Sequence, residues 1–508
     1  MLNHDKIKTV EELAEARESF RRQGKKVVHC HGVFDLLHIG HIRYFEQARQ
    51  MGDLLIVTLT PDRFVDKGPH RPAFPENLRA EAIASLNCVD LVAINQWPTA
   101  EETLRLIRPD VYVKGSEFRN ITDDVTGKIG REAAVVKEIG ARLAFTDDIV
   151  FSSTTLINRY LSTLPDEMQQ YLNLFRHRYT MDDLLRTVDR MSSLRVLVIG
   201  DTILDDYVFC AAIGTSSKDP ALAVKYQSHD LFAGGVLAVA NHVANFAETV
   251  QLVTVLGEKE SHEDFIRSKL SRNITPYFLT QPDSPTLIKR RYVDGYTLNK
   301  LFEVYIMDDS GLPPDRNREV CGWLAENLPN YDLVIAADFG HGAVSREMVA
   351  TLSARAPFLA INTQANAGNR GFHTVSRYPR ADFVCIAEHE IRLELRDLKG
   401  DIHLMMEEVQ NRIGCDLMVV TRGRKGCAVR TKDGDVIELP SFTEKVVDRI
   451  GAGDAFLSVS SLAAALGVEP EIVGFLGNVT GAIAVQILGN KKPVDRQELK
   501  KHIITFVK

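Results

Sequence analysis

The chain has 508 residues, of which 45% are hydrophobic and 25% charged, and its formal net charge is −7. This length exceeds what one hydrophobic core supports, so we expect two or three domains of a globular protein. The acidic balance argues against a nucleic-acid partner. The seven scattered cysteines indicate reduced thiols, and neither a signal-peptide core nor a run long enough to cross a bilayer is present. We therefore expect a cytoplasmic protein with no membrane partner.

The first strong motif occupies residues 31–41, with the sequence HGVFDLLHIGH, between a short apolar strand and a helix. Gly32 and Gly40 let the backbone approach a ligand closely, and the helix N-terminus favours phosphate. His38 and His41 are three residues apart, so both imidazoles face one side of the turn, where they can stabilise an α-phosphate under attack. Two capping histidines in an ordinary strand–helix loop are the alternative interpretation.

Strands and helices alternate through the first part of the chain. Near-continuous apolar strands of this kind predict a parallel sheet covered on both faces, with ligands at the carboxyl ends of the strands. The expected strands are 27–30, 53–60, 89–94 and 110–114, and the expected helices are 76–86, 99–107 and 156–161.

Several polar residues fall at those strand ends. Lys67 lies in a basic loop that contains Gly and Pro, Arg79 lies in the next helix, and Lys114 ends a strand. Hydroxyl side chains fill residues 152–155 at the start of the last helix. Phosphate or nucleotide binding is one interpretation. The alternatives are a solvated basic loop for Lys67, an ion pair with a surface glutamate for Arg79, and capping of the last helix for the hydroxyl side chains.

The motif at 31–41 resembles the signature of the cytidylyltransferase-like nucleotidyltransferases. Over about residues 26–162 the chain is similar to the adenylyltransferase part of the bifunctional heptose 7-phosphate kinase/heptose 1-phosphate adenylyltransferases. The resemblance implies transfer of NMP from ATP or CTP to a sugar 1-phosphate with release of pyrophosphate, in which His38 and His41 act on the α-phosphate. It also implies nucleotide or phosphate contacts from Gly32, Phe34, Asp35, Gly40, Lys67, Arg79, Lys114, Gly115, Ser153 and Thr154.

Residues 164–193 carry apolar side chains at helical spacing. We predict that they form a helical connector, with a helix over 182–191, between a first domain at 1–163 and a second at 194–508. A new strand at 195–199 is followed by a Gly-Asp turn, and further buried strands are expected at 333–338 and 417–421.

The strongest motif of the second domain is Gly451-Ala452-Gly453-Asp454. Consecutive glycine-rich N–H groups at a helix start form an anion hole for a transferring phosphoryl group. Asp454 follows in the first turn, where it can accept a proton from an attacking hydroxyl. The alternative is that Asp454 has a structural role only, as a carboxylate that caps the N-terminus of a helix after a glycine-rich turn.

With Asp205, Gly234-Gly235 and Thr421-Arg422-Gly423 in order before it, this motif resembles the ribokinase-like (PfkB) sugar kinases over about residues 194–504. The resemblance implies a second α/β domain in which Asp454 is the catalytic base. It implies an anion hole of Gly451, Ala452 and Gly453, ATP contacts from Thr421 and Gly423, and a sugar site of Asp205, Gly234, Gly235, Lys289 and Arg291.

Two positions depart from the pattern of that family. Its Asn-x-x-Glu, tied to magnesium, is Ala387-Glu388-His389-Glu390 here, and a frequent Asn after Gly-Gly is Ala238. Glu390 is retained as an indirect magnesium contact.

The whole chain predicts a sugar kinase fused to a nucleotidyltransferase, in the reverse of the heptose enzymes' domain order. It would use Mg²⁺ and ATP, or CTP in the first domain, act on a heptose-like sugar phosphate, and form a homodimer. The alternatives are a cytidylyltransferase that makes a CDP-polyol, or a nucleotidyltransferase with an inert sugar-sensing or dimerising kinase-like domain.

Overall fold

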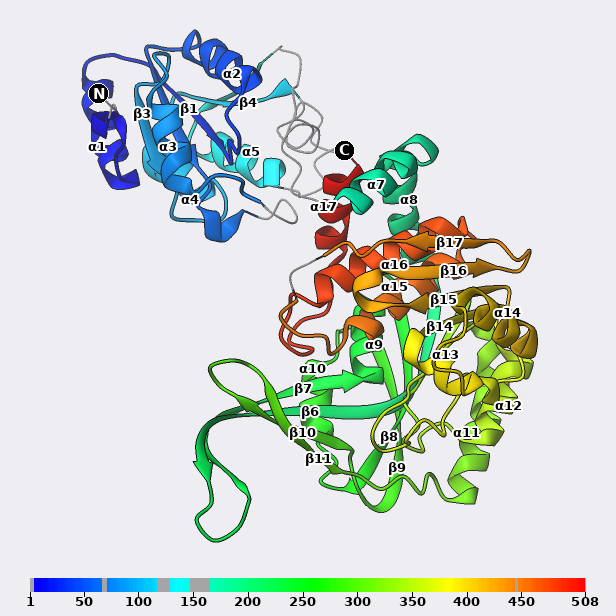
Figure 1. The fold of residues 1–508 in the computed structure, drawn as a ribbon. Coiled ribbons are helices and arrows are strands. Elements are labelled where there is room, and N and C mark those ends of the chain that lie inside the picture. The colour runs from blue at the N-terminus through cyan, green and yellow to red at the C-terminus, as the bar shows by residue number, and fades with distance from the viewer. Residues whose placement is uncertain (1–3, 66–70, 117–127, 147–164, 444–445, 508) are drawn as a thin grey trace. The chain divides into compact units, whose positions relative to one another are not determined.

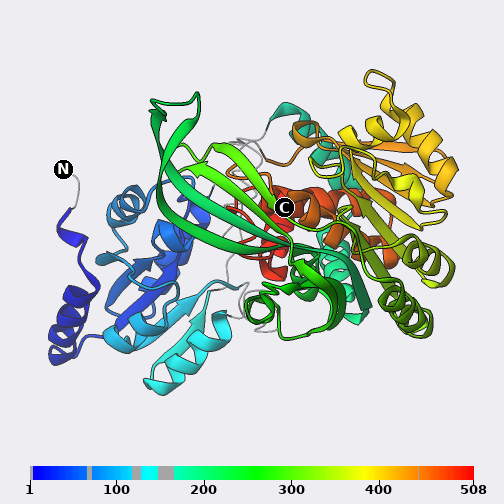
Figure 2. The same cartoon turned by 90° about the horizontal axis from the view of Figure 1, so that it is seen from below.

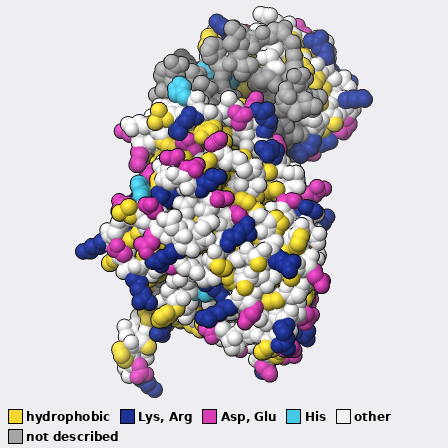
Figure 3. All heavy atoms as spheres, turned by 90° about the vertical axis from the view of Figure 1, so that its right-hand side faces the viewer, with side chains coloured by type: hydrophobic (Ala, Val, Ile, Leu, Met, Phe, Trp, Pro, Cys, Tyr) yellow, Lys and Arg dark blue, Asp and Glu magenta, His cyan; other side chains and the backbone are white. Residues whose placement is uncertain are grey.

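The computed structural model describes residues 4–65, 71–116, 128–146, 165–443 and 446–507. The chain divides into two compact units, one of Met1–Pro165 with Lys500–Lys508 and one of Asp166–Leu499. No helix among the described residues has the length and apolar character needed to span a membrane. On the face drawn in Figure 3, basic and acidic side chains are interspersed, so charge of neither sign gathers there.

The first unit is built on a five-stranded sheet in the order β3-β2-β1-β4-β5, in which every pairing is parallel (Figure 1). Most residues of β1 and β2 are buried, because a parallel sheet is covered on both faces. The strands are β1 Val27–Gly32, β2 Leu54–Leu59, β3 Leu91–Ile94, β4 Val111–Lys114 and β5 Arg142–Phe145. The helices are α1 Val10–Arg22, α2 Ile39–Arg49, α3 Glu76–Ala84, α4 Glu101–Ile107 and α5 Lys128–Glu138.

These elements confirm the predicted α/β fold and its strand–helix alternation, with boundaries that differ by one or two residues. α1, α5 and β5 were not predicted. The capping box of α1 is nevertheless readable in the sequence: the Thr9 hydroxyl accepts from the N–H of Glu12, whose carboxylate accepts from the N–H of Thr9. The predicted helix at 156–161 lies outside the described residues.

The second unit has a central sheet in which β6 (Arg195–Thr215) pairs in parallel with β8 (Thr249–Lys259) and β12 (Leu333–Asp338). The remaining strands of this sheet are β9 Ile274–Pro285, β13 Leu359–Thr363, β14 Phe383–Ala387, β15 Leu417–Thr421, β16 Cys427–Thr431 and β17 Val436–Leu439. Its helices are α9 Val236–Ala244, α10 Glu263–Lys269, α11 Pro314–Asn327, α12 Arg346–Arg355, α13 Glu388–Leu395, α14 Ile402–Ile413, α15 Ala452–Ala465 and α16 Pro470–Ala484. The last helix, α17 Arg496–Val507, begins in the second unit, and its residues from Lys500 onward belong to the first.

β6 does not end at the predicted Gly-Asp turn. It continues beyond residue 201 and there pairs with β7 (Leu222–Gly235) and β10 (Ile288–Asp294), and β11 (Lys300–Ile306) completes this second layer. The long ribbon of β6 and β7 extends away from the central sheet (Figures 1 and 2). We use the name outer layer for these strands together: the part of β6 beyond residue 201, β7, β10 and β11. Asp201 therefore lies where β6 passes from one layer to the other.

The predicted connector contains two helices, α7 (Asp166–Arg178) and α8 (Met181–Arg190), and both belong to the second unit. α7 packs on α16 through stacked rings of Phe175 and Phe475, whose centroids are 4.3 Å apart. Nearby, Arg178 Nη1 lies 2.7 Å from Glu471 Oε2, which is almost fully buried. These contacts fix α7 to the body of the second unit.

Candidate functional sites

The histidine pair of the first unit lies at the start of α2. His38 is the N-cap residue, and its Nδ1 accepts a hydrogen bond from the N–H of Gly40 at 3.1 Å. The rings of His38 and His41 stack with centroids 4.0 Å apart. Burial lowers the pKa of His38, and with Nδ1 as acceptor its ring proton is on Nε2. The imidazole of His38 therefore carries its proton on Nε2 and lies beside His41, at the positive end of the helix.

The turn before α2 is held in an unusual conformation. Phe34 and Leu36 have φ of 49° and 58°, a region that side chains other than glycine rarely adopt. The Phe34 ring closes on Gly32, where an added Cβ would come within 2.9 Å of it. Buried Asp35 accepts the N–H groups of Ala73 and Phe74 and lies 3.3 Å from Arg71 Nη1. The motif turn is thereby tied to residues 71–74.

Two of the basic residues predicted to bind phosphate, Arg79 and Lys114, are described, and both contact other groups of the protein. Arg79 is buried and donates to the carbonyls of Val33 and Thr60 and, at 2.6 Å, to Asp62 Oδ1. It thus joins the motif turn to the end of β2. Lys114 Nζ lies 2.7 Å from Glu132 Oε2, and Gly115 follows at the strand end. Lys67, Ser153 and Thr154 lie outside the described residues.

A buried polar network under the motif was not predicted. Thr58 Oγ1 on β2 lies 2.8 Å from His29 Nε2 and 2.9 Å from His31 Nδ1 on β1. Burial lowers the pKa of His29 to about 3, so its imidazole is neutral. The alternation His-Cys-His within a strand places both imidazoles on one face, and this was the signal available in the sequence.

The catalytic aspartate predicted for the second unit lies in the first turn of α15. Gly451, with φ of 81°, is the N-cap residue, so residues 451–453 form the turn that begins the helix, where the N–H of Ala452 donates to the carbonyl of Arg449 at 3.4 Å. The pKa of Asp454 is raised to about 7, mainly by desolvation and also by repulsion from Asp205, while Lys289 acts in the opposite direction. A carboxylate with this pKa exchanges protons readily near neutral pH.

The predicted sugar site gathers at the start of the outer layer. Asp205 forms a close ion pair with Arg291 Nη1, and Arg291 Nε donates to Glu303 at 2.9 Å. Gly234 faces Asp205 so closely that an added Cβ would lie 2.1 Å from Oδ2, while Gly235 has φ of 56° at the turn into α9. The carboxylate of Asp205 is therefore oriented by its neighbours before any ligand arrives.

Lys289 completes this group from β10. Its side chain is buried, with Nζ 5.2 Å from the centroid of the Tyr305 ring. Burial lowers its pKa, and the neighbouring Asp205 opposes that shift. The ammonium is thus placed among Asp205, Asp454 and Asp201, each of which interacts with it electrostatically.

Asn490 connects the sugar site to the anion-hole turn and was missed from the sequence. Its Nδ2 donates to Asp205 Oδ2 at 3.3 Å. Its Oδ1 lies so close to Gly451 that an added Cβ there would come within 2.1 Å. One amide therefore contacts both the predicted sugar-binding carboxylate and the predicted anion hole. No local pattern marks it, because the three positions are far apart in sequence.

A second unpredicted residue, Asp448, supports the same turn. Its carboxylate accepts from the Tyr207 hydroxyl at 2.7 Å, from Lys300 Nζ at 3.1 Å and from the N–H groups of Ile450 and Gly489. Tyr207 and Lys300 belong to the outer layer, so Asp448 ties that layer to the loop that begins α15.

The predicted nucleotide contacts, Thr421 and Gly423, lie at the end of β15. Thr421 ends β15, and Gly423 follows with φ of 59°. Between them, Arg422 lies 2.8 Å from Glu438 Oε2 and 3.2 Å from Glu388 Oε2.

Glu390, the retained acidic residue, is held by the backbone. It accepts the N–H of Ala387 at 2.7 Å and that of Ala365 at 3.2 Å. Burial raises its pKa to about 7, and repulsion from Asp454 acts in the same direction. Glu390 therefore lies within electrostatic reach of the predicted base.

Comparison with known families identifies both units. The model of the pfkB family carbohydrate kinases matches residues 193–496, and the cytidylyltransferase-like model matches residues 29–159.

Curated relatives match the N-terminal third. The bifunctional protein HldE of Syntrophotalea carbinolica is 40% identical over 159 residues, which are 31% of this chain and 31% of that protein. The HldE protein of Gluconobacter oxydans is 39% identical over 158 residues, which are 31% of this chain and 32% of that protein. The aligned region thus spans about a third of the length of the curated relatives it matches.

Among solved structures, phosphofructokinase-2 from Escherichia coli in complex with potassium aligns with a TM-score of 0.52 and 13% identity. The alignment covers 62% of this chain and 100% of that one. At this identity the similarity shows the fold of the second unit: a ribokinase-like α/β fold.

Proposed function

The chain belongs to the pfkB family of carbohydrate kinases, and from this premise we propose a bifunctional sugar-activating enzyme. Its second unit phosphorylates a sugar or sugar phosphate with Mg-ATP, and its first unit joins NMP to a sugar 1-phosphate with release of pyrophosphate. A heptose-like sugar is the first substrate to test, because the first unit resembles heptose 1-phosphate adenylyltransferases. The observation that carries the kinase proposal is Asp454, with a pKa raised to about 7 beside a glycine turn.

In the kinase step, Asp454 accepts the proton of the attacking hydroxyl as the sugar oxygen bonds to the γ-phosphorus of ATP. The bond between that phosphorus and the β–γ bridging oxygen breaks, and ADP leaves. The N–H groups of Gly451, Ala452 and Gly453 stabilise charge on the transferring group. Asp205 and the Gly234-Gly235 turn orient the sugar, and Lys289 and Arg291 interact with phosphate on the sugar or the nucleotide.

Magnesium would reach this site mainly with the nucleotide, and when bound it neutralises charge on the triphosphate. Glu390 fits an indirect role, since each of its carboxylate oxygens keeps acceptor capacity after binding one backbone N–H, and it lies near Asp454.

In the transferase step, an oxygen of the sugar 1-phosphate attacks the α-phosphorus of the NTP, the α–β bridging bond breaks, and pyrophosphate leaves. His38 and His41 donate to the α-phosphate, where charge grows in the transition state. Lys114 and the helix N-terminus add positive potential. ATP and CTP are both to be tested, because a CTP preference with a polyol phosphate would favour the alternative of a CDP-polyol synthase.

One observation favours a second candidate for the pfkB unit, an inert sugar-sensing or dimerising module. Ala387 has no side-chain oxygen at the N-cap of α13, where the family pattern has an asparagine.

Two assays on the full chain test the proposal. The first measures pyrophosphate release from each NTP with sugar 1-phosphates, and the second measures ADP formation with hexoses, heptoses and their phosphates. ADP formation that depends on a sugar supports the kinase, whereas sugar binding without ADP formation supports the inert module.

A further inference from the structure

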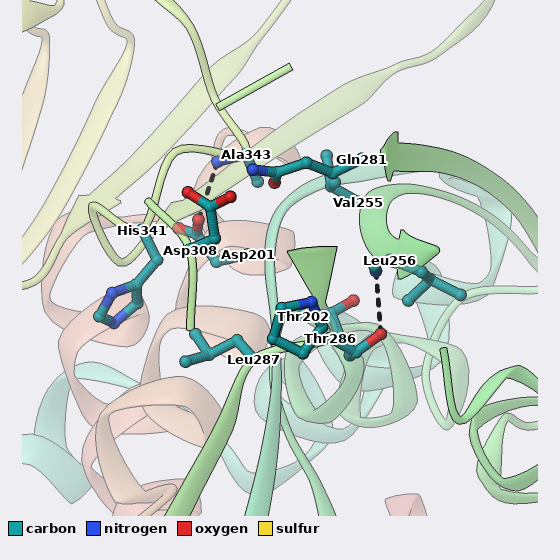
Figure 4. Close-up of a pocket in the computed structure, with 12 residues that line it drawn as sticks. Asp201, Thr202, Val255, Leu256, Gln281, Thr286, Leu287, Asp308, His341 and Ala343 are labelled. Carbon is teal, nitrogen blue, oxygen red and sulfur yellow. Dashed lines mark hydrogen bonds between the residues drawn. The ribbon is translucent and has the colours of Figure 1, made fainter. Parts of the chain in front are cut away.

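A pocket lies beside the predicted sugar site, at the carboxyl ends of strands of the central sheet. Its polar lining includes Asp201 on β6, Gln281 on β9, Asp308 after β11 and His341 after β12 (Figure 4). Ligands of open α/β sheets bind at this edge. The five residues predicted to bind sugar are not among those that line the pocket in the described part of the chain.

The loop that carries His341 is fixed from two sides. Asp201 accepts the N–H of Phe339 at 2.8 Å and that of Ala343 at 3.0 Å. The side-chain amides of Asn366 and Asn369 donate to the carbonyl of Phe339 at 2.7 and 3.2 Å. Side chains from separate segments thus hold the backbone of this loop before a ligand arrives, which is the preorganisation expected of a binding site.

His341 itself is buried, with 7% of its surface exposed, and its Nε2 has no hydrogen-bond partner among the residues that the structure describes. An unsatisfied buried polar atom is destabilising, so a preorganised loop that presents one indicates a hydrogen-bond partner supplied by a ligand. Burial lowers the pKa of His341 to about 3, and the charge of Lys289 acts in the same direction. The imidazole is therefore neutral at physiological pH and suits a hydroxyl rather than a phosphate.

The other lining groups favour the same ligand chemistry. Asp201 and Asp308 contribute carboxylates, Thr202 and Thr286 contribute hydroxyls, and the lining residues that the structure describes include no lysine or arginine. Such a surface accepts hydrogen bonds from hydroxyls and repels phosphate. The ammonium of Lys289 lowers the pKa of both Asp454 and His341, so it lies within electrostatic reach of the base and of the pocket.

We propose that this pocket binds an uncharged, hydroxyl-bearing portion of the sugar, away from the hydroxyl that is phosphorylated, and that His341 hydrogen-bonds one of its hydroxyls. This inference rests on the proposed kinase function and makes it more specific. His341 is then a specificity-determining residue that selects sugars carrying that hydroxyl, because a substrate without it leaves the imidazole unpaired.

The test is a chemical double-mutant cycle on the full chain. Isothermal titration with a non-hydrolysable ATP analogue measures the affinity for D-glycero-D-manno-heptose 7-phosphate and for each of its monodeoxy analogues. The variants are His341→Leu, which removes the hydrogen-bonding atoms, and His341→Gln, which keeps a donor and an acceptor. His229→Leu, on an exposed histidine of β7, serves as the matched control. Thermal unfolding of each variant verifies the fold.

We expect His341→Leu to weaken the parent sugar by about 10- to 100-fold. One monodeoxy analogue should bind the wild type and His341→Leu equally, since the hydroxyl and the imidazole act as a pair. His341→Gln should recover part of the affinity. Equal losses for every analogue, or no loss for the parent sugar, would overturn the inference.

The titration separates this inference from the proposed function, because it does not depend on turnover. Coupling between His341 and one hydroxyl in a protein that forms no ADP supports the pocket and contradicts the kinase. Normal ADP formation without such coupling supports the kinase and contradicts the proposed role of the pocket. If the wild type binds none of these sugars, nor hexoses, heptoses and their phosphates, both are overturned.

Discussion

The pH dependence of the kinase reaction follows from the environment of Asp454. With a pKa of about 7, the carboxylate is ionised in about one tenth of the molecules at pH 6 and about nine tenths at pH 8. Because the ionised form accepts the proton, kcat should rise about tenfold over this interval and then level off. Initial rates of sugar-dependent ADP formation at saturating substrates measure this profile. Asp454→Asn should lower kcat by about 10²–10⁴-fold.

Two charged neighbours of Asp454 allow a test of whether Asp454 is the group that sets the pH profile. Repulsion by Asp205 raises the pKa of Asp454, so Asp205→Asn should move the midpoint of the profile to lower pH. Lys289 lowers that pKa, so Lys289→Met should move the midpoint to higher pH. A flat profile in the wild type, or a midpoint that neither substitution moves, would refute the assignment of Asp454 as the titrating base.

Three further predictions test other parts of the account. His41→Ala should reduce pyrophosphate release by about 10²–10³-fold, through loss of a transition-state donor, and a rate within a few-fold of the wild type would refute that role. Excess EDTA should abolish both activities because each uses a magnesium-bound triphosphate, so full activity in EDTA would contradict this requirement. Asn490→Ala should lower the kcat of ADP formation by about tenfold with an unchanged unfolding temperature, because it removes the amide between Asp205 and Gly451; an unchanged kcat would refute its positioning role.

Much of the first unit was predictable because its signals are local. Continuous apolar runs gave β1 and β2, and residues 31–41 placed the histidine pair at a strand–helix turn, as the structure has it. Partners remote in sequence were not predictable. Lys114 meets Glu132 from α5, and Arg79 reaches back to Val33 and Thr60.

The second unit shows more clearly that contacts between distant segments cannot be predicted from local sequence patterns. A Gly-Asp pair at 200–201 predicted a turn, yet β6 continues to Thr215 because β7 and β10 pair with it. β7 follows β6 directly as its antiparallel partner, whereas β10 (Ile288–Asp294) lies far along the sequence. Asp454 was identified from its glycine turn, a local pattern. Asn490 and His341 were not, since each acquires its position only when distant segments pack together.

The central claim is that one chain carries two independent catalytic sites, and a paired substitution tests it most directly. Pyrophosphate release and sugar-dependent ADP formation are measured side by side for the wild type, His41→Ala and Asp454→Asn. The account predicts that His41→Ala loses only pyrophosphate release and that Asp454→Asn loses only ADP formation, since each unit has its own sheet and each proposed site lies within one unit. Loss of both activities in either folded variant, or a wild type that catalyses only one reaction, would contradict it.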